Sequence, residues 1–425
     1  MKIVIGSATY TAVKVLRFDP EADVTGMRLA VNEFTAEIMT TDSVDAGAFA
    51  TLTDDDDYVW ARYWIVEASH PSGQVLRLRA QSPLLLLDRV RLEPVMYSSA
   101  DAQTAMAAVF DTVNQAYGTD VGYAIDGAFE NDTFTGYCPE QTARERLQWM
   151  CFVLGAWVST AFRGWAEVLP VSASAGYVPE SDTFWRPESA WGDYVTGVEV
   201  MAYSYTAGEP GTRDKWVEAD STVYIQTEQS FALGNSAVPV TAAANVVRVE
   251  GVTLINPGNA GTILARMASM HYARRSLQAD VVYYGRVRPG ELCAVSTGEE
   301  WVQGYVKKIS LAFGKGIRAR MELGQVADVA SAVLTVRRMY GEELLAEEEY
   351  SLPIGIPYEI ENPYQESYEV GKRVFRPLTE TLEGTLTGDT TATVYHELAL
   401  NHLAGILSVY IVDQETLNGD RLRIR

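Results

Sequence analysis

Short alternating runs of hydrophobic and polar residues dominate the chain over about residues 1–92. Turn-forming residues such as Pro20 and Gly47 separate these runs. A period of two residues is typical of strands with one buried face, so this stretch predicts a β domain. The same alternation returns after Trp191 and predicts that the protein is mainly β.

Three segments depart from this alternation and show the three-to-four-residue spacing of amphipathic helices. The first covers 101–117, with Asp101 as its cap and Gly118 as its stop. The second begins at about Thr142 and continues until Gly155 weakens it. The spacing thus predicts that helices interrupt the β structure.

The third helix is predicted to begin at Asn259, which would be its cap. Arg274 and Arg275 are expected in its last turn, where cations complement the helix dipole. Its apolar side consists of Ile263, Leu264, Met267 and His271. We expect this helix to bridge two β segments.

Composition narrows the class of protein. At roughly 150 residues per domain, 425 residues predict about three domains. The net charge of −22 argues against a surface that binds nucleic acid or anionic lipid. Three cysteines, an odd number, imply no disulfide framework and indicate a reducing compartment. Cys138 and Cys151 have no histidine nearby in sequence, so a cysteine nucleophile would need distant residues.

Targeting signals are not evident in the sequence. The amino terminus enters strand-like sequence without the apolar core and cleavage site of a signal peptide. The most apolar short runs, 84–87 and 151–158, fall far below the ~20 residues that span a bilayer. We therefore expect neither ordinary secretion nor a membrane-spanning segment.

The chain also contains an internal similarity. A shift of 241 residues superposes an aromatic-rich strand, a glycine turn and an arginine-bearing strand on a second such unit. The identical pairs are Trp60 and Trp301, Ser69 and Ser310, Gly73 and Gly314, Arg77 and Arg318, and Arg79 and Arg320. Duplication of a β unit explains them, and two unrelated hairpins are the alternative. Two related units per chain would let a trimer present six similar surfaces.

The search for complete catalytic, cofactor-binding or metal-binding motifs finds none in the sequence. The acidic run 54–57 lacks the spacing and glycine of a calcium loop and predicts a solvated loop tip. The glycines of 314–319 precede alternating residues, whereas a dinucleotide motif precedes a helix. His396 and His402 are six residues apart and lie off one helical face. We therefore predict no enzyme activity, no cofactor and no metal site.

Two parts of the chain resemble the bacteriophage tail hub family, which comprises baseplate hub and tail-tip proteins. The matching residues are 64–68 and 84–89 for the end of the first tube-like barrel, and 136–139, 142–148 and 152–156 for a helix of the inserted domain. The similarity is diffuse and covers about residues 1–330. It implies a homotrimer whose two barrels per subunit form a pseudo-hexameric ring.

The resemblance also implies partners and a location. Such a ring would contact a tail tube or distal tail protein ring on one side and a spike, fibre or tip protein on the other. A tape-measure protein would be a further partner, and DNA would be only passing cargo. The protein would belong to the virion tail, or to a phage-like contractile particle, and would assemble in the bacterial host cytoplasm. Acidic residues facing the lumen would then repel phosphate.

Residues from about 332 to 397 resemble mucin-binding-type repeats of bacterial surface proteins, which are small β-grasp-like modules. The matching parts are 336–344, 355–358, 374–378 and 393–395, without a second copy of the repeat. An alternative function follows, a receptor- or glycan-binding tail-tip protein in which Tyr340, Tyr358 and Tyr364 stack on sugars. The same tyrosines could instead pack a small β core. A third hypothesis, a cell-wall hydrolase, is disfavoured because the chain stops at Arg425.

These observations together predict a mainly β fold with an α+β insertion. The predicted domains are a first tube-like β-barrel over 1–95 completed by strands from 191–239, a mixed α/β inserted domain over 96–190, a second tube-like β-barrel over 240–330, a mucin-binding-repeat-like β module over 331–397 and a tail over 398–425.

Overall fold

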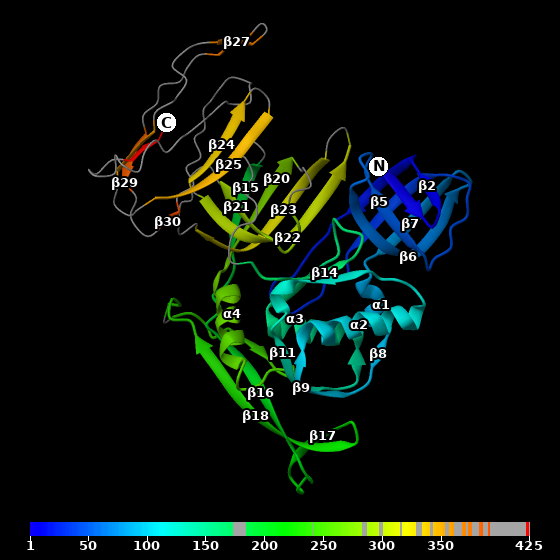
Figure 1. The fold of residues 1–425 in the computed structure, drawn as a ribbon, viewed down its shortest axis with the longest axis vertical. Coiled ribbons are helices and arrows are strands. Elements are labelled where there is room, and N and C mark those ends of the chain that lie inside the picture. Colours follow the sequence, from blue (N-terminus) through cyan, green and yellow to red (C-terminus); the bar gives the residue numbers. More distant parts are fainter. Residues whose placement is uncertain are drawn as a thin grey trace. The chain divides into compact units, whose positions relative to one another are not determined.

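The computed structural model describes residues 1–172, 184–239, 241–282, 287–296, 301–314 and 317–328, together with eight short strands between 334 and 424. The chain divides into two compact units, Met1–Asp328 and Val329–Arg425. Strands predominate over helices among the described residues (Figure 1), so the predicted mainly β fold is confirmed.

The first unit begins with a curled antiparallel sheet of seven strands, drawn in blue in Figure 1. In sheet order the strands are β2 (Ala8–Tyr10), β1 (Lys2–Ile5), β5 (Phe49–Thr53), β6 (Val59–Ser72), β7 (Val75–Gln81), β4 (Glu33–Met39) and β3 (Val13–Phe18). Along β7, Leu76, Leu78 and Ala80 are buried while Arg77 and Arg79 are exposed. The predicted period of two therefore separates a core face from a solvent face.

A second antiparallel sheet is built from five strands much later in the chain. In sheet order they are β15 (Phe184–Trp191), β20 (Arg275–Val282), β23 (Ile317–Asp328), β22 (Trp301–Phe313) and β21 (Leu292–Ser296). The sheet takes in residues 184–190, which the sequence had placed in the inserted domain, because β15 pairs with β20 along its length.

The two sheets share one strand arrangement. The order β5, β6, β7, β4, β3 corresponds to β21, β22, β23, β20, β15, with antiparallel neighbours throughout. One row of paired residues crosses the first sheet through Ile65, Ala80, Phe34 and Phe18, and the matching row crosses the second through Val306, Leu323, Leu277 and Ser189. This correspondence favours duplication over two unrelated hairpins.

The pairing register refines the equivalence that the sequence suggested. Ser69 faces Arg77 in the first sheet, whereas Ser310 faces Arg320 in the second, and not Arg318. The difference of two residues arises because the second hairpin is longer: ten positions separate Ser310 from Arg320, whereas eight separate Ser69 from Arg77. A gap-free shift therefore aligns β6 with β22 but misaligns the following strands.

Two of the predicted helices occur in the chain between the two sheets, the first of them with its predicted aspartate cap. Helix α2 (Ala102–Tyr117) begins where the Asp101 side chain accepts a 2.7 Å hydrogen bond from Thr104 N. Helix α3 (Ala143–Leu154) begins with a capping box between Thr142 and Glu145. Both helices end at a glycine in the left-handed conformation, Gly118 and Gly155, as expected for residues without a Cβ.

Short elements complete this helical region and share one buried core with α2 and α3. They are α1 (Leu84–Asp88), β8 (Arg91–Leu92), β9 (Val95–Asp101), β10 (Tyr123–Ile125), the 3₁₀ helix Gly127–Phe129, β11 (Thr133–Cys138), β12 (Gln141–Thr142), β13 (Ala156–Ser159) and β14 (Ala166–Pro170). They pair as β10-β14-β13, β11-β9 and β12-β8, so helices and strands alternate here.

A third sheet lies between β15 and β20 in the chain. It consists of β17 (Lys215–Ala219), β18 (Thr222–Gly234), β16 (Gly197–Ala207) and β19 (Val246–Val249). These strands pair with one another, so the prediction that strands from 191–239 complete the first sheet is wrong. Strands β17 and β18 pair with each other as a hairpin, and none of the four strands pairs with a described strand of the first sheet.

Helix α4 (Ala260–Tyr272) contacts β16 and β18, and its end and its cap differ from the prediction. It stops at Tyr272, and Arg275 already begins β20, so the two arginines lie outside the helix. Asn259 makes no capping bond to the helix and instead accepts from Asn256 N. The side chain of Asn256 accepts from Gly258 N and Asn259 N, and so caps the turn before the helix.

In the second unit the described elements are all strands. They are β24 (Leu334–Tyr340), β25 (Glu343–Leu352), β26 (Pro357–Ile360), β27 (Tyr368–Val370), β28 (Arg373–Phe375), β29 (Leu382–Thr385), β30 (Thr390–Thr391) and β31 (Leu422–Ile424). They pair as β24-β25-β30, β29-β26-β31 and β27-β28. Within the part of the chain that the structure describes, no helix has the length and apolar character needed to cross a bilayer.

Candidate assembly site at the junction of the two sheets

The chain that leaves β3 crosses directly to the second sheet and extends its edge. Ala22 N donates to Lys307 O at 2.9 Å, and Ile309 N donates to Pro20 O at 3.0 Å. Glu21 and Lys308 form the antiparallel bridge between these two hydrogen bonds. We call residues 18–22 the crossing segment, because through it the first sheet is tied to β22 by backbone hydrogen bonds.

Aromatic side chains fill the junction beneath the crossing segment. Phe18 is completely buried, and its ring centroid lies 6.2 Å from that of Tyr63 in the first sheet and 6.5 Å from that of Phe313 in the second. Phe162, from the loop after β13, lies 6.1 Å from Phe18 and 5.6 Å from Trp60. Buried residues of both sheets therefore belong to one continuous core, which fixes the sheets relative to each other.

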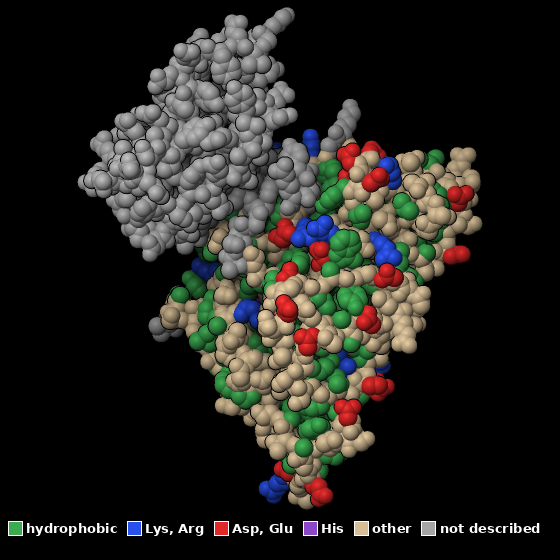
Figure 2. All heavy atoms as spheres, in the orientation of Figure 1, with side chains coloured by type: hydrophobic (Ala, Val, Ile, Leu, Met, Phe, Trp, Pro, Cys, Tyr) green, Lys and Arg blue, Asp and Glu red, His purple; other side chains and the backbone are tan. Residues whose placement is uncertain are grey.

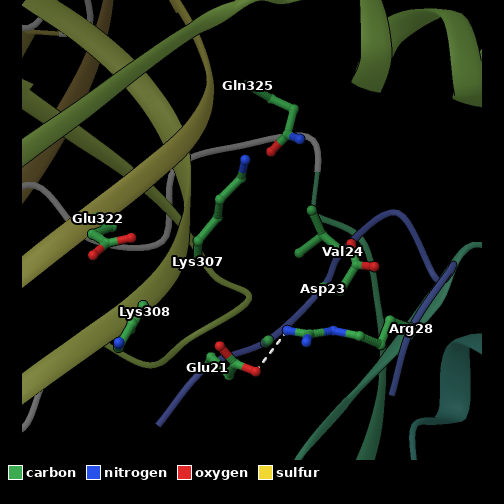
Figure 3. Close-up of a pocket in the computed structure, with 9 residues that line it drawn as sticks. Glu21, Asp23, Val24, Arg28, Lys307, Lys308, Glu322 and Gln325 are labelled. Atoms are coloured by element: carbon green, nitrogen blue, oxygen red, sulfur yellow. Dashed lines mark hydrogen bonds and ion pairs between the residues drawn. The ribbon is translucent and has the colours of Figure 1, made fainter. Parts of the chain in front are cut away.

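A cavity of about 270 Å³ lies beside the crossing segment (Figure 3). Its lining residues are Glu21, Ala22, Asp23, Val24, Arg28, Lys307, Lys308, Glu322 and Gln325. Arg28 donates to Glu21 at 2.6 Å, while Lys307 and Gln325 approach from β22 and β23. The lining contains acids and bases but no Ser, Thr, Cys or His, so it offers no hydroxyl, thiol or imidazole nucleophile.

A second cavity, of about 390 Å³, lies between β9, β11 and the hairpin of β16 and β18. Its lining residues are Met96, Tyr97, Ser98, Thr135, Gly136, Tyr203, Ser204, Tyr205, Tyr224 and Asn256. Burial raises the pKa of Tyr97 to about 12, so its phenol is neutral at physiological pH. The lining is aromatic and uncharged, and it contains no carboxylate that would act as a general base.

The three cysteines, Cys138, Cys151 and Cys293, are unpaired and buried. Burial raises the pKa of Cys138 and Cys151 to about 12 and also raises that of Cys293. A thiol with such a pKa is protonated near neutral pH and is a poor nucleophile. These side chains pack the core.

Two histidines and the acidic run occupy structural positions. His70 lies near the end of β6, with Nε2 3.0 Å from Asp42 O. Burial lowers the pKa of His271 on α4. Asp54 Oδ1 accepts from the backbone N–H groups of Asp56 and Tyr58, which forms a tight turn. Among the described residues, no group of three or more His, Cys, Asp or Glu side chains could hold a metal.

The predicted glycan-contact tyrosines belong to the second unit. Tyr340 ends β24 and Tyr358 lies in β26. Tyr364 lies outside the described residues. Sugar stacking by these tyrosines, and with it the receptor-binding alternative, stays a prediction.

Sequence reasoning missed the crossing segment, although the sequence carries a signal for it. The alternation of β3 continues after Phe18 through Pro20, Ala22 and Val24, all of which are buried. Pro20 was interpreted instead as a turn-forming residue that separates two strands. Proline is tolerated here because its carbonyl accepts the hydrogen bond from β22 and no N–H is required.

Comparison with solved structures shows that tail proteins have a similar fold. One similar solved structure is the tail protein from Neisseria meningitidis, with a TM-score of 0.53 and 12% identity over 76% of this chain and 95% of that chain. Another is the 43 kDa tail protein of prophage MuSo2 from Shewanella oneidensis, with a TM-score of 0.51 and 8% identity over 76% of this chain and 95% of that chain. At these identities the likeness shows a common fold. No family model matches the chain, and no curated protein matches its sequence.

Proposed function

We propose that this protein is the structural hub of a phage tail or of a phage-like contractile injection particle. In this role it is a homotrimer that joins a tube of sixfold symmetry to a tip or spike of threefold symmetry. The observation that carries the proposal is the shared strand arrangement of the two sheets. Three chains with two equivalent sheets each supply six similar units, which is what a symmetry adaptor requires.

The proposal includes partners on both sides of the ring. A tail tube or distal tail protein ring stacks on one side, and a spike, fibre or tip protein on the other. A tape-measure protein and passing DNA traverse the lumen. The protein then resides in the virion tail after assembly in the host cytoplasm, and its work is structural and not enzymatic. The fold shared with phage tail proteins supports this assignment.

Sedimentation combined with imaging tests this function. The full chain is expected to sediment as a trimer in analytical ultracentrifugation, and an image of the assembled particle should place it between tube and tip. A stable monomer that is absent from every tail particle would contradict the proposal. A monomer is a strong negative result because the ring needs six units and one chain supplies two.

A further inference from the structure

The second sheet has its own counterpart of the crossing segment. Phe18 and Ser189 occupy the same place in the matching rows of the two sheets. Counting onward from these residues, Pro20 corresponds to Trp191, Glu21 to Gly192 and Ala22 to Asp193. Residues 191–193 therefore leave the edge strand β15 as residues 20–22 leave β3.

These two equivalent segments differ in burial. Pro20 and Ala22 are buried against β22, whereas Trp191 is 61% exposed and Asp193 is exposed. The Trp191 ring is held by Arg274, whose guanidinium carbon lies 4.9 Å from the ring centroid. A large aromatic side chain held in place at the surface is typical of a contact that forms on assembly.

The first sheet also has the matching acceptor edge. Residues 66–68 of β6 correspond to 307–309 of β22, since Ala68 pairs with Leu78 as Ile309 pairs with Met321. On its other side β6 pairs with β5 only as far as Trp64, and Ile65 N then donates to Ala48 O. Beyond that point, no described strand pairs with this edge. By the same register, the Val66 carbonyl and the Ala68 N–H point away from β7. The Lys307 carbonyl and the Ile309 N–H likewise point away from β23, toward the crossing segment.

We propose that residues 191–193 of one copy pair antiparallel with residues 66–68 of β6 in a second copy. This contact between chains has the same geometry as the contact that the crossing segment makes with β22 within each chain. It rests on the proposed function in that a head-to-tail contact of this kind must close after three copies to give a ring of six sheets. The occupant of each exposed β6 edge is thus another copy of this protein.

Charge distinguishes the two kinds of junction. Within the chain, acidic Glu21 bridges to basic Lys308. Between copies the signs are exchanged. Lys308 is replaced by Glu67, whose side chain is 61% exposed and lies 3.7 Å from Arg79 of its own sheet, and Arg274 lies next to Gly192. Arg274 makes no ion pair among the described residues, so Glu67 of the next copy can provide one. The exchange disfavours pairing of 191–193 with β22, because Arg274 would then meet Lys308.

The core of the contact differs as well. Phe18, which packs against Phe313 at the junction within the chain, corresponds to Ser189 between copies, and Ser189 is exposed. A polar surface of this kind leaves the unassociated chain soluble, whereas an exposed aromatic surface would favour aggregation. The junction between copies is therefore suited to subunits that fold first and associate afterwards.

Engineered cysteines test the contact directly. Variants Glu67→Cys and Gly192→Cys, mixed and oxidised, should form an interchain disulfide, and the double variant should form covalent dimers and trimers. The matched control is Glu21→Cys with Lys308→Cys, the equivalent positions within one chain, which should close without a change in mass. The native cysteines are all buried and should give little background.

The outcomes separate this inference from the proposed function. Covalent species that stop at trimer support both, whereas a ladder beyond trimer supports the contact and contradicts the closed ring. A chain that sediments as a trimer but yields no interchain disulfide, while the control pair closes, overturns the contact and leaves the hub proposal standing. A monomer without any interchain disulfide overturns both.

A tryptophan substitution supplies a second measurement. Trp191→Ala should weaken trimer association by about tenfold or more, since buried tryptophans commonly dominate an interface. The control is Trp216→Ala in β17, which removes an equally large side chain that is 52% exposed and outside the contact. Equal effects of the two substitutions on the trimer would contradict the assigned role of Trp191.

Discussion

At the scale of single residues, ion pairs cover the solvent face of the first sheet and extend its cross-strand pairing. Arg77 donates to Glu37 at 2.6 Å and Arg79 to Glu33 at 2.9 Å, in each case from β7 to β4. Figure 2 shows acidic and basic side chains interspersed over one face of the first unit. Exposed pairs of this kind contribute about 1 kcal/mol or less each, so they favour the register and solubility more than stability.

The buried thiols give a prediction about reactivity and pH. Alkylation of the native chain near pH 8 should leave all three cysteines unmodified, whereas unfolding should expose them. Because the folded state raises the pKa of Cys151 from 9.0 to about 12, the unfolded state loses this proton first as pH rises above 9. Stability should therefore fall with rising pH in that range, by roughly 1.4 kcal/mol per pH unit for each such thiol.

The check is chemical denaturation at a series of pH values between 8 and 10. Tyrosines also titrate in this range, so Cys151→Ala is the matched variant, and the difference between the two slopes isolates the thiol. Identical slopes for both proteins would show that the Cys151 thiol is not protected in the folded state.

At the scale of elements, the helices were more predictable from sequence than the sheets. Local signals define α2 and α3, since Asp101 and Thr142 cap them and a glycine ends each. The end of α4 was missed because Arg275 fits a last helical turn equally well, and only its pairing with Trp191 of β15 and Val326 of β23 places it in a strand. Strand partners lie far apart in the chain, so alternation predicts a strand but not its neighbours.

Close packing of Gly290 gives an element-scale prediction. This residue precedes β21, has a φ of +98°, and a Cβ added to it would lie 2.3 Å from the Trp157 ring of β13. Gly290→Ala should therefore lower stability by about 1–3 kcal/mol through overpacking, with added backbone strain. Gly73→Ala, in the turn between β6 and β7 with open space around it, is the control. Thermal unfolding of both variants checks this, and equal midpoints would contradict the close contact.

At the scale of the whole molecule, the sequence indicated the repeat but not how its halves connect. The shift of 241 residues aligned Trp60 with Trp301 correctly, because these residues lie in β6 and β22, and both strands come before the hairpin turns that differ in length. The crossing segment could not be found in this way, since its partner lies almost 300 residues later in the chain and Pro20 resembles a turn signal. Likewise, the strands of the third sheet were assigned to the first barrel, because both regions show the same alternation of hydrophobic and polar residues.

The division into two units predicts that residues 1–328 fold without the rest. The described hydrophobic clusters are made of residues from this unit, and on this basis we expect it to form its own core. A fragment of residues 1–328 should retain the near-ultraviolet circular dichroism of its tryptophans and a cooperative thermal transition. The full chain is the reference, and a fragment without a cooperative transition would show that residues 329–425 complete the core.

The crossing segment has a kinetic consequence for assembly. In the proposed ring of three chains, three of the six contacts between neighbouring sheets would form during folding of each chain, at the high effective concentration of a covalent link. The other three would form between chains, two of them by collision and the last by closure of the ring, so two encounters would join six units. If the proposed contact holds, substitutions at equivalent positions have different effects. A substitution of Pro20 or Lys308 should lower the yield of folded chain, whereas one of Trp191 or Glu67 should leave folded subunits that fail to associate.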